Sequence, residues 1–188
     1  PDIDMLFFAY DSFKKAKDVE APGKDVARLS LAAHFFYLGI ALHVLKKFED
    51  SINAYIISLE LHEHARAYIN RGVAYVGLGE DERAIEDFNK AIELNKDYAK
   101  AYYNRGLAYA KQQKYNEAIK DFNKAIELNP DLAEAYYNRG LVYARLGEHE
   151  RAREDILRAG NLYTNKRRIE DAIRVCEVIF KFNIGEES

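Results

Sequence analysis

The 188-residue sequence contains one cysteine, three prolines and no tryptophan, and its charges nearly cancel. Cys176, the single cysteine, cannot form an intramolecular disulfide, so a reducing compartment is favoured and we expect a cytoplasmic protein. The 28 basic and 31 acidic residues leave a net charge of −3. This balance argues against a nucleic-acid partner, because proteins that bind the phosphate backbone usually carry a basic excess.

Long apolar runs are also missing. No stretch of about 18 apolar residues occurs, so neither a membrane span nor a membrane partner is expected. The N-terminus lacks the basic, apolar and small-residue regions of a signal peptide. The chain starts at Pro1 rather than Met, as expected of a trimmed protein or of part of a longer one.

The sequence lacks the motifs of catalysis and metal binding. It has no glycine-rich phosphate loop, nucleophile elbow or Ser/His/Asp set, so we expect no enzyme, no catalytic residue and no cofactor. His62 and His64 are two residues apart and point in different directions on a helix, so no metal site is expected. Cys176 falls on an apolar stripe, which favours a core position over a nucleophile.

What the sequence does contain is a repeat. Gly72, Gly106 and Gly140 each follow Asn-Arg and are spaced 34 residues apart. The segment DFNKAIELN at 87–95 recurs unchanged at 121–129. A fixed period between about 20 and 50 residues predicts a repeat array.

Each of the three clear copies, 65–98, 99–132 and 133–166, contains two segments with helical spacing of apolar residues. Small residues let the two helices approach closely, while tyrosine and phenylalanine fill the remaining space. In the middle copy the packing residues are Tyr102, Gly106, Tyr109, Ala118, Phe122 and Ala125. A degenerate copy, one residue short of the period, is expected at 32–64, because terminal repeats face a different neighbour.

The residues in the turn between the paired helices predict its backbone conformation. Gly79 and Gly147 occupy this turn and suit a left-handed helix C-cap. Gln113 replaces the glycine in the middle copy, at an expected cost of about 1 kcal/mol.

Charged clusters are expected to form solvated surface. Asp87 and Asp121 lie on predicted helices among lysines and arginines, as solvated faces do. The basic cluster of Lys166, Arg167 and Arg168, with Arg151, Arg153 and Arg158 upstream, is interleaved with acidic residues. A mixed surface is therefore favoured over an RNA site.

Two further helices are predicted outside the repeats. Residues 1–19 form an amphipathic pattern that either covers the first repeat or mediates self-association. Its apolar side carries Leu6, Phe7, Tyr10 and Phe13. A final helix after Asn165, with Ile173 and Cys176 on its apolar side, would cap the array. We thus expect an N-terminal helix and the start of the first repeat's long helix in 1–31, four repeats in 32–166, and a capping helix and tail in 167–188.

The 34-residue helix–turn–helix period resembles the tetratricopeptide repeat (TPR) family. The resemblance is strong over 65–166 and weaker over 32–64. In the middle copy it rests on Tyr102, Gly106, Tyr109, Ala118, Phe122, Ala125 and Pro130. It implies an all-α fold, a right-handed superhelical array of antiparallel helix pairs with an N-terminal helix and a C-terminal capping helix. It also implies that the first helix of each pair lines a concave groove where peptides usually bind.

A second face of each first helix remains once the packing residues are assigned. Stacking would align this face into columns of Ile/Tyr/Tyr, Asn/Asn/Asn and Val/Leu/Leu. The candidate peptide-binding residues on it, with the charged residues beside them, are Arg66, Ile69, Asn70, Val73, Lys100, Tyr103, Asn104, Leu107, Lys111, Glu134, Tyr137, Asn138, Leu141 and Arg145.

The asparagine column gives the sharpest signal. An amide side chain has both donor and acceptor groups, so it can pair with the N–H and C=O of a peptide together. The column looks like the asparagine ladders that some TPR proteins use for peptide main chains. The alternative is that each asparagine is tied to neighbouring helices.

A closer resemblance, to co-chaperone TPR domains with a carboxylate clamp, largely fails. The first Lys and Asn of that clamp would fall on Phe36 and Ile40, or on Ile69 and Val73 one repeat later. A full clamp is not expected, because capture of a carboxylate needs several convergent cations.

These observations predict a non-enzymatic scaffold or adaptor that binds a peptide segment of a partner in the concave groove. The charges of the face lean towards an acidic ligand. A self-assembling structural module, or a regulatory domain acting on an enzyme partner, stays open, with the terminal helices mediating oligomerisation.

Overall fold

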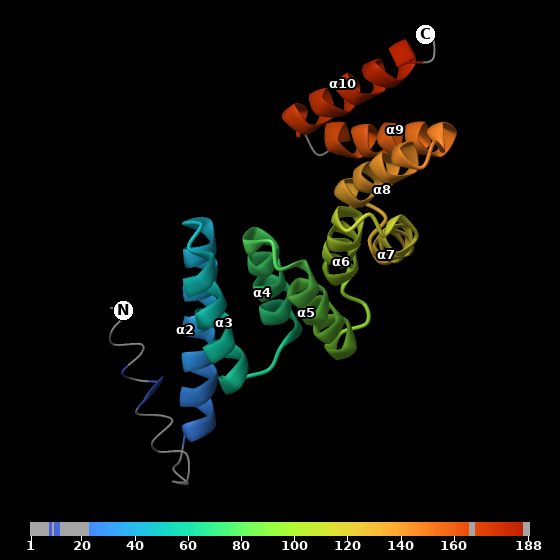
Figure 1. The fold of residues 1–188 in the computed structure, drawn as a ribbon. Helices are drawn as coiled ribbons and strands as arrows, with labels where there is room; N and C mark the ends of the chain where they lie inside the picture. The colour runs from blue at the N-terminus through green and yellow to red at the C-terminus, as the bar shows by residue number, and fades with distance from the viewer. Residues whose placement is uncertain (1–7, 9, 12–22, 166–167, 186–188) are drawn as a thin grey trace. The chain divides into compact units, whose positions relative to one another are not determined.

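The computed structural model describes residues 8, 10–11, 23–165 and 168–185, and the elements formed by these residues are all helices (Figure 1). The predicted all-α class is confirmed. The helices are α2 (Lys24–Val44), α3 (Phe48–Leu61), α4 (Ala65–Leu78), α5 (Asp81–Leu94), α6 (Ala99–Lys111), α7 (Tyr115–Leu128), α8 (Ala133–Arg145), α9 (His149–Asn165) and α10 (Ile169–Gly185).

The chain forms two compact units, which divide between Lys96 and Asp97. In the first unit α2 packs on α3, α3 on α4, and α4 on α5. In the second unit α6 packs on α7, α7 on α8, α8 on α9, and α9 on α10. The helices α4, α6 and α8 begin 34 residues apart, whereas α3 begins 33 residues before α5. The division of the chain at 31, 64, 98, 132 and 166 stays a prediction.

Close approach within each helix pair depends on the glycine of the Asn-Arg-Gly triplet. A Cβ atom added at Gly72 would lie 2.6 Å from the ring of Phe88, and one added at Gly106 would lie 2.8 Å from the ring of Phe122. Both rings are fully buried. The predicted packing of glycine against an aromatic ring is therefore confirmed in both copies.

The first copy holds its helix pair together with different residues. Ser51 and Ser58 stand where later copies have alanine, and both are fully buried. The Ser51 hydroxyl donates to the carbonyl of Gly39 over 2.8 Å, and the Ser58 hydroxyl donates to the carbonyl of Ala32 over 2.9 Å. Because a buried hydroxyl needs a hydrogen-bond partner, these bonds make serine acceptable at a core position.

The turns between paired helices have the predicted left-handed conformation. Gly79 and Gly147 have φ angles of 80° and 76°, and Gln113 has a φ of 60°. Lys46, with a φ of 59°, takes the same place in the first copy.

Asp87 and Asp121 are buried, so the prediction of solvated faces is wrong for them. They are 4% and 5% exposed. The guanidinium of Arg71 donates to both carboxylate oxygens of Asp87 over 2.6 and 2.8 Å. Arg105 and Asp121 pair in the same way over 2.7 Å, and Asp155 repeats the arrangement in the third clear copy. This two-point pairing offsets the cost of removing the charges from water.

The apolar side of α10 also differs from the prediction. Cys176 is exposed and Ile173 is 54% exposed. Val175 is buried instead, at 2% exposed, and packs beside Gly160 of α9. Since glycine has no side chain, α9 leaves room for Val175, so this residue rather than Cys176 fixes the packed face.

The predicted helix at 1–19 lies mostly outside the described residues. At Tyr10 the ring packs edge-on against Phe35 of α2, with ring centres 5.8 Å apart, and the hydroxyl donates to Glu60 of α3. Tyr10 therefore covers part of the α2–α3 pair. Self-association through this segment stays a prediction.

Helix α2 is more apolar than expected from the absence of an unbroken apolar run. Its window Asp25–Val44 has a mean hydropathy of 1.3, enough for a membrane span by length and composition alone. Only 22% of this window is buried. Phe35 and Phe36 of α2 are buried, at 0% and 5% exposed, which accounts for part of this hydropathy.

Candidate peptide-binding faces

The first helices of the second unit, α6 and α8, share a face. The amide of Asn138 on α8 donates to the hydroxyl of Tyr103 on α6 over 3.2 Å and to the carbonyl of Glu134 over 2.8 Å. Residues predicted to lie in neighbouring columns are thus in direct contact within this unit.

Tyr103 belongs partly to the core. Its ring centre lies 6.1 Å from that of Phe122, and its side chain packs with Leu107 against a buried cluster that includes Phe122 and Val142. Burial, aided by the charge of Glu134, raises the pKa of Tyr103 to about 12. The phenol is therefore neutral at physiological pH, and half-buried Tyr103 and Leu107 offer a ligand only their outer edges.

The acidic residue of this face is neutralised from outside the repeats. Glu134 pairs with Arg168, which precedes α10 and also lies 4.8 Å above the ring of Tyr163. Arg168 stands 34 residues after Glu134, so the repeat period itself could have identified this partner. Lys100 and Arg145 are exposed and make no ion pair with any described residue. The second unit therefore displays a net positive face.

The three asparagines of the predicted ladder differ in their hydrogen bonds. Asn138 donates a hydrogen bond to the hydroxyl of Tyr103, and Asn70 lies beside Tyr55. Asn104 is half-buried, and its side chain makes no hydrogen bond with any described residue. Asn104 thus keeps the full pairing capacity that main-chain recognition requires.

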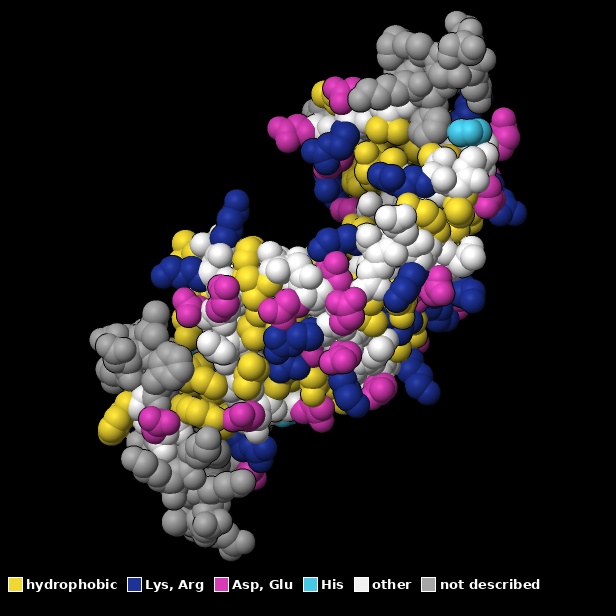
Figure 2. Space-filling view, in the orientation of Figure 1, with side chains coloured by type: hydrophobic (Ala, Val, Ile, Leu, Met, Phe, Trp, Pro, Cys, Tyr) yellow, Lys and Arg dark blue, Asp and Glu magenta, His cyan; other side chains and the backbone are white. Residues whose placement is uncertain are grey.

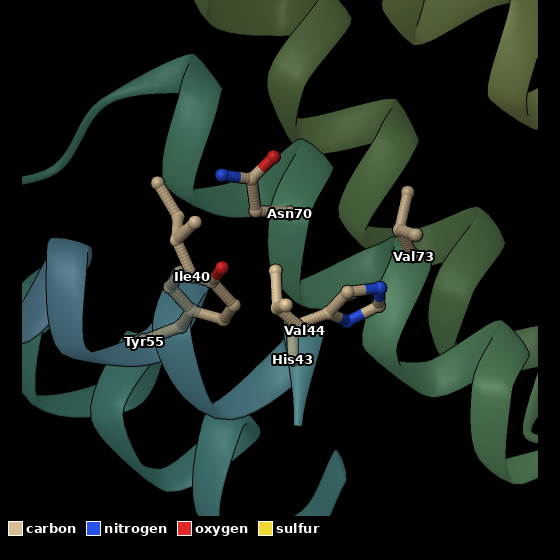
Figure 3. A pocket seen from close by; sticks show the side chains of 6 residues that line it. All are labelled: Ile40, His43, Val44, Tyr55, Asn70 and Val73. Atoms are coloured by element: carbon tan, nitrogen blue, oxygen red, sulfur yellow. The ribbon is translucent and has the colours of Figure 1, made fainter. Parts of the chain in front are cut away.

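The face of the first unit contains a pocket of about 200 Å³ (Figure 3). Side chains converge on it from α2, α3 and α4. They are Ile40, His43, Val44, Tyr55, Asn70 and Val73. The predicted residues Asn70 and Val73 are therefore brought together here, beside α2.

Other predicted residues of the first unit are placed differently. Ile69 is 4% exposed, so its predicted role at the ligand surface is corrected to one in the core. Arg66 is exposed, and its guanidinium lies 5.4 Å from the ring centre of Phe36. Sequence reasoning missed Ile40 and Val44 as lining residues, although their spacing of four places them on one helix face.

The remaining candidates lie on the face of the second unit. Tyr137 and Leu141 are half-buried on α8, and Tyr137 packs against a buried cluster around Ile156. Lys111, at the end of α6, is exposed.

His62 ends α3, and His64 precedes the first residue of α4. Their rings stack with centres 5.7 Å apart, and Nδ1 of His64 accepts a hydrogen bond from the backbone N–H of Ala67 over 3.2 Å. His64 thus caps α4. In the described part of the chain, no group of three or more His, Cys, Asp or Glu side chains is arranged to hold a metal ion.

A second hollow, of about 860 Å³, lies between α7, α8 and α9 and is polar. Arg139 in its wall pairs with Asp155, Arg151 pairs with Glu148, and Arg158 lies 5.9 Å from the ring centre of Tyr136. On the face shown in Figure 2, basic and acidic side chains are interspersed over each unit. These pairs fit the predicted mixed surface around Arg151 and Arg158.

Family models define the class of the protein. A model described as TPR repeat matches residues 72–113 and 108–147, and one described as tetratricopeptide repeat matches 133–165. Together they span half of the chain. The chain belongs to the tetratricopeptide repeat family, as its sequence pattern predicted.

Several solved structures resemble the chain. A crystal structure of MamA is 27% identical, with 87% of this chain and 91% of that chain covered and a TM-score of 0.65. The TPR domain of Arabidopsis OM64 is 28% identical over 61% and 96% of the two chains, with a TM-score of 0.59. The first TPR of Spaghetti (RPAP3), bound to the HSP90 peptide SRMEEVD, is 30% identical over 62% and 93%, with a TM-score of 0.60. No curated protein sequence matches the chain.

Proposed function

We propose that the chain is a non-enzymatic adaptor that binds a peptide segment of a partner protein on the exposed faces of its first helices. The observation that carries the proposal is Asn104, whose amide has no hydrogen-bond partner among the described residues, on a face that it shares with Tyr103 and Asn138. An unpaired amide on a helix face can bond the N–H and C=O of a peptide. The likeness to a TPR domain that holds a peptide supports the same ligand class.

The charges of the faces favour an acidic segment. Lys100 and Arg145 are without ion-pair partners among the described residues, whereas Glu134 is neutralised by Arg168. The peptide SRMEEVD bound by the RPAP3 domain is also acidic. We do not extend that particular ligand to this chain, because Phe36 and Ile40 stand where a clamp needs Lys and Asn. We place the adaptor in the cytoplasm, since its one cysteine suits a reducing compartment.

Selection from a random heptapeptide library on the full chain tests the proposal. Selected peptides are then titrated by fluorescence polarisation against wild type and Asn104→Ala. Loss of hydrogen bonds worth about 0.5–1.5 kcal/mol should weaken binding about 2- to 13-fold. Asn116→Ala is the matched control, because Asn116 is exposed on α7 of the same unit. If Asn104→Ala and Asn116→Ala bind equally well, the role of Asn104 is wrong, and if no peptide is selected, the function is wrong.

A further inference from the structure

The pocket of the first unit has a chemistry that main-chain recognition does not explain. We infer that it binds one aromatic side chain of the partner peptide. This inference deepens the proposed function and rests on it.

The wall of the pocket excludes charged side chains. Ile40 and Val44 of α2 and Val73 of α4 contribute aliphatic surface, and none of the six lining residues is Lys, Arg, Asp or Glu. An aspartate or glutamate entering this space would lose part of its hydration without gaining a lysine or arginine partner, which is unfavourable. The pocket therefore selects an uncharged side chain, although the cations elsewhere on the faces attract acidic segments.

The size of the pocket suits a ring. An apolar cavity of about 150 Å³ in another protein binds benzene, and this pocket measures about 200 Å³. A valine or alanine side chain would leave much of the space unfilled, and unfilled space forfeits dispersion contacts. A phenyl or phenol ring fills it more completely.

Polar groups also lie among the apolar residues of the pocket. Tyr55 lies at the pocket, and burial raises its pKa to about 12, so its hydroxyl is neutral. Asn70 lines the pocket and is half-buried, and its amide has both donor and acceptor groups. Nδ1 of His43 is buried and has no hydrogen-bond partner in the described part of the chain. The pocket is thus lined by one residue, His43, with a buried polar atom that no described residue satisfies.

Titration of the full chain with small probes tests the pocket directly. The probes are p-cresol, which reproduces the tyrosine side chain, and acetate, which reproduces that of aspartate. In ¹H–¹⁵N NMR spectra we expect p-cresol to shift the amide signals of Ile40, Asn70 and Val73, and acetate to leave them unchanged. Absence of these shifts with p-cresol, or equal shifts with acetate, would overturn the inference.

A matched pair of variants shows whether the shifts arise in the pocket. Val44 lines its mouth and is 75% exposed, so Val44→Phe narrows the opening without disturbing the core. Val26, on the same helix and 72% exposed, does not line the pocket, and Val26→Phe makes the same chemical change there. We expect p-cresol to bind Val44→Phe at least tenfold more weakly than Val26→Phe. Equal affinities contradict the inference.

The peptide library separates this inference from the function on which it rests. We expect peptides selected on wild type to carry an aromatic residue at one fixed position, and selection on Val44→Phe to lose that preference. Peptides that bind without an aromatic preference would refute the pocket while the adaptor function stands. If p-cresol binds but no peptide is selected, the peptide function fails instead.

Discussion

A buried ion pair recurs in the three clear copies of the repeat, between the arginine of Asn-Arg-Gly and an aspartate 16 residues later. In the middle copy the side chains of Arg105 and Asp121 are only 19% and 8% exposed. The guanidinium also lies 5.6 and 5.9 Å from the ring centres of Tyr102 and Tyr109. Each pair joins the two helices of one repeat, so its loss should affect the whole helix pair.

Replacement of Asp121 by asparagine is expected to destabilise the chain strongly. The change keeps the shape of the side chain but leaves Arg105 buried without a counter-charge, which should cost about 3 kcal/mol. Urea denaturation followed by circular dichroism measures the loss. Glu127→Gln is the control, because it breaks the exposed pair between Lys124 and Glu127 and should cost less than about 0.5 kcal/mol. Equal losses in the two variants would show that burial adds nothing to the Arg105–Asp121 pair.

His64 should make the stability depend on pH. Burial, aided by the positive charges of His62 and Arg66, lowers the pKa of His64 below its ordinary value of 6.5. The folded state thus binds the proton less readily than the unfolded state. The contribution of His64 is complete above pH 6.5 and is lost as the pH falls from 6.5 through the lowered pKa.

The measurement is the urea midpoint of wild type and His64→Asn between pH 7.5 and 5. Asparagine also caps helices but does not titrate in this range, so the variant should lose less stability on acidification than wild type. His34→Asn is the control, because His34 is exposed on α2 and bonds only to the carbonyl of Ser30. Parallel curves for wild type and His64→Asn would rule out this role for His64.

Residue types at a fixed period were enough to predict the packing of Gly106 on Phe122, because size and apolarity decide it. They were not enough for Asp121. Whether a carboxylate is buried depends on a partner across the helix pair, and sequence reasoning treated Arg105 and Asp121 separately. The joint recurrence of both residues every 34 positions was the available signal.

At the scale of the element, α10 shows why the face of a single helix is hard to predict. Its sequence carries apolar residues on more than one side, including Ile173, Val175 and Cys176. Gly160 of α9 decides which of them is buried, since a Cβ added there would lie 3.0 Å from Val175. Which residue of α10 is buried therefore depends on α9 and cannot be predicted from the sequence of α10 alone.

Truncation of Val175 should therefore loosen α10. Val175→Ala removes two buried methyl groups and is expected to cost about 2 kcal/mol. Hydrogen exchange should quicken in α10 before α6 or α7, because elements open locally. Ile173→Ala, at a position 54% exposed, is the control and should change exchange little. A larger effect from Ile173 would restore the face predicted from sequence.

For the molecule as a whole, the sequence predicted the family and the all-α fold, but not how strongly each residue of the proposed peptide-binding faces is buried or bonded. Asn70, Asn104 and Asn138 are equivalent by period but have different surroundings, because Asn70 lies beside Tyr55 in a pocket and Asn138 donates a hydrogen bond to Tyr103. The pocket escaped prediction because the first copy is one residue short, so its columns do not align by simple counting. Departures of the first copy from the repeat pattern thus make the face of the first unit differ from that of the second.

The charges of the second unit lead to a prediction about salt. Lys100 and Arg145 are exposed, so their attraction for an acidic heptapeptide from the library is screened as ionic strength rises. Affinity should fall steadily between 0.05 and 0.5 M NaCl, and the double variant Lys100→Gln/Arg145→Gln should bind about tenfold more weakly at low salt. Its salt dependence should also be flatter than that of wild type.

A control must remove the same charge without touching the proposed face. Lys120 and Arg153 are exposed on the second helices α7 and α9, so Lys120→Gln/Arg153→Gln changes the net charge equally. If attraction depended on net charge alone, both double variants would flatten the salt dependence to the same extent. A flatter slope for Lys100→Gln/Arg145→Gln alone assigns the attraction to the first-helix face, because only there do the removed cations lie within a Debye length of the bound peptide.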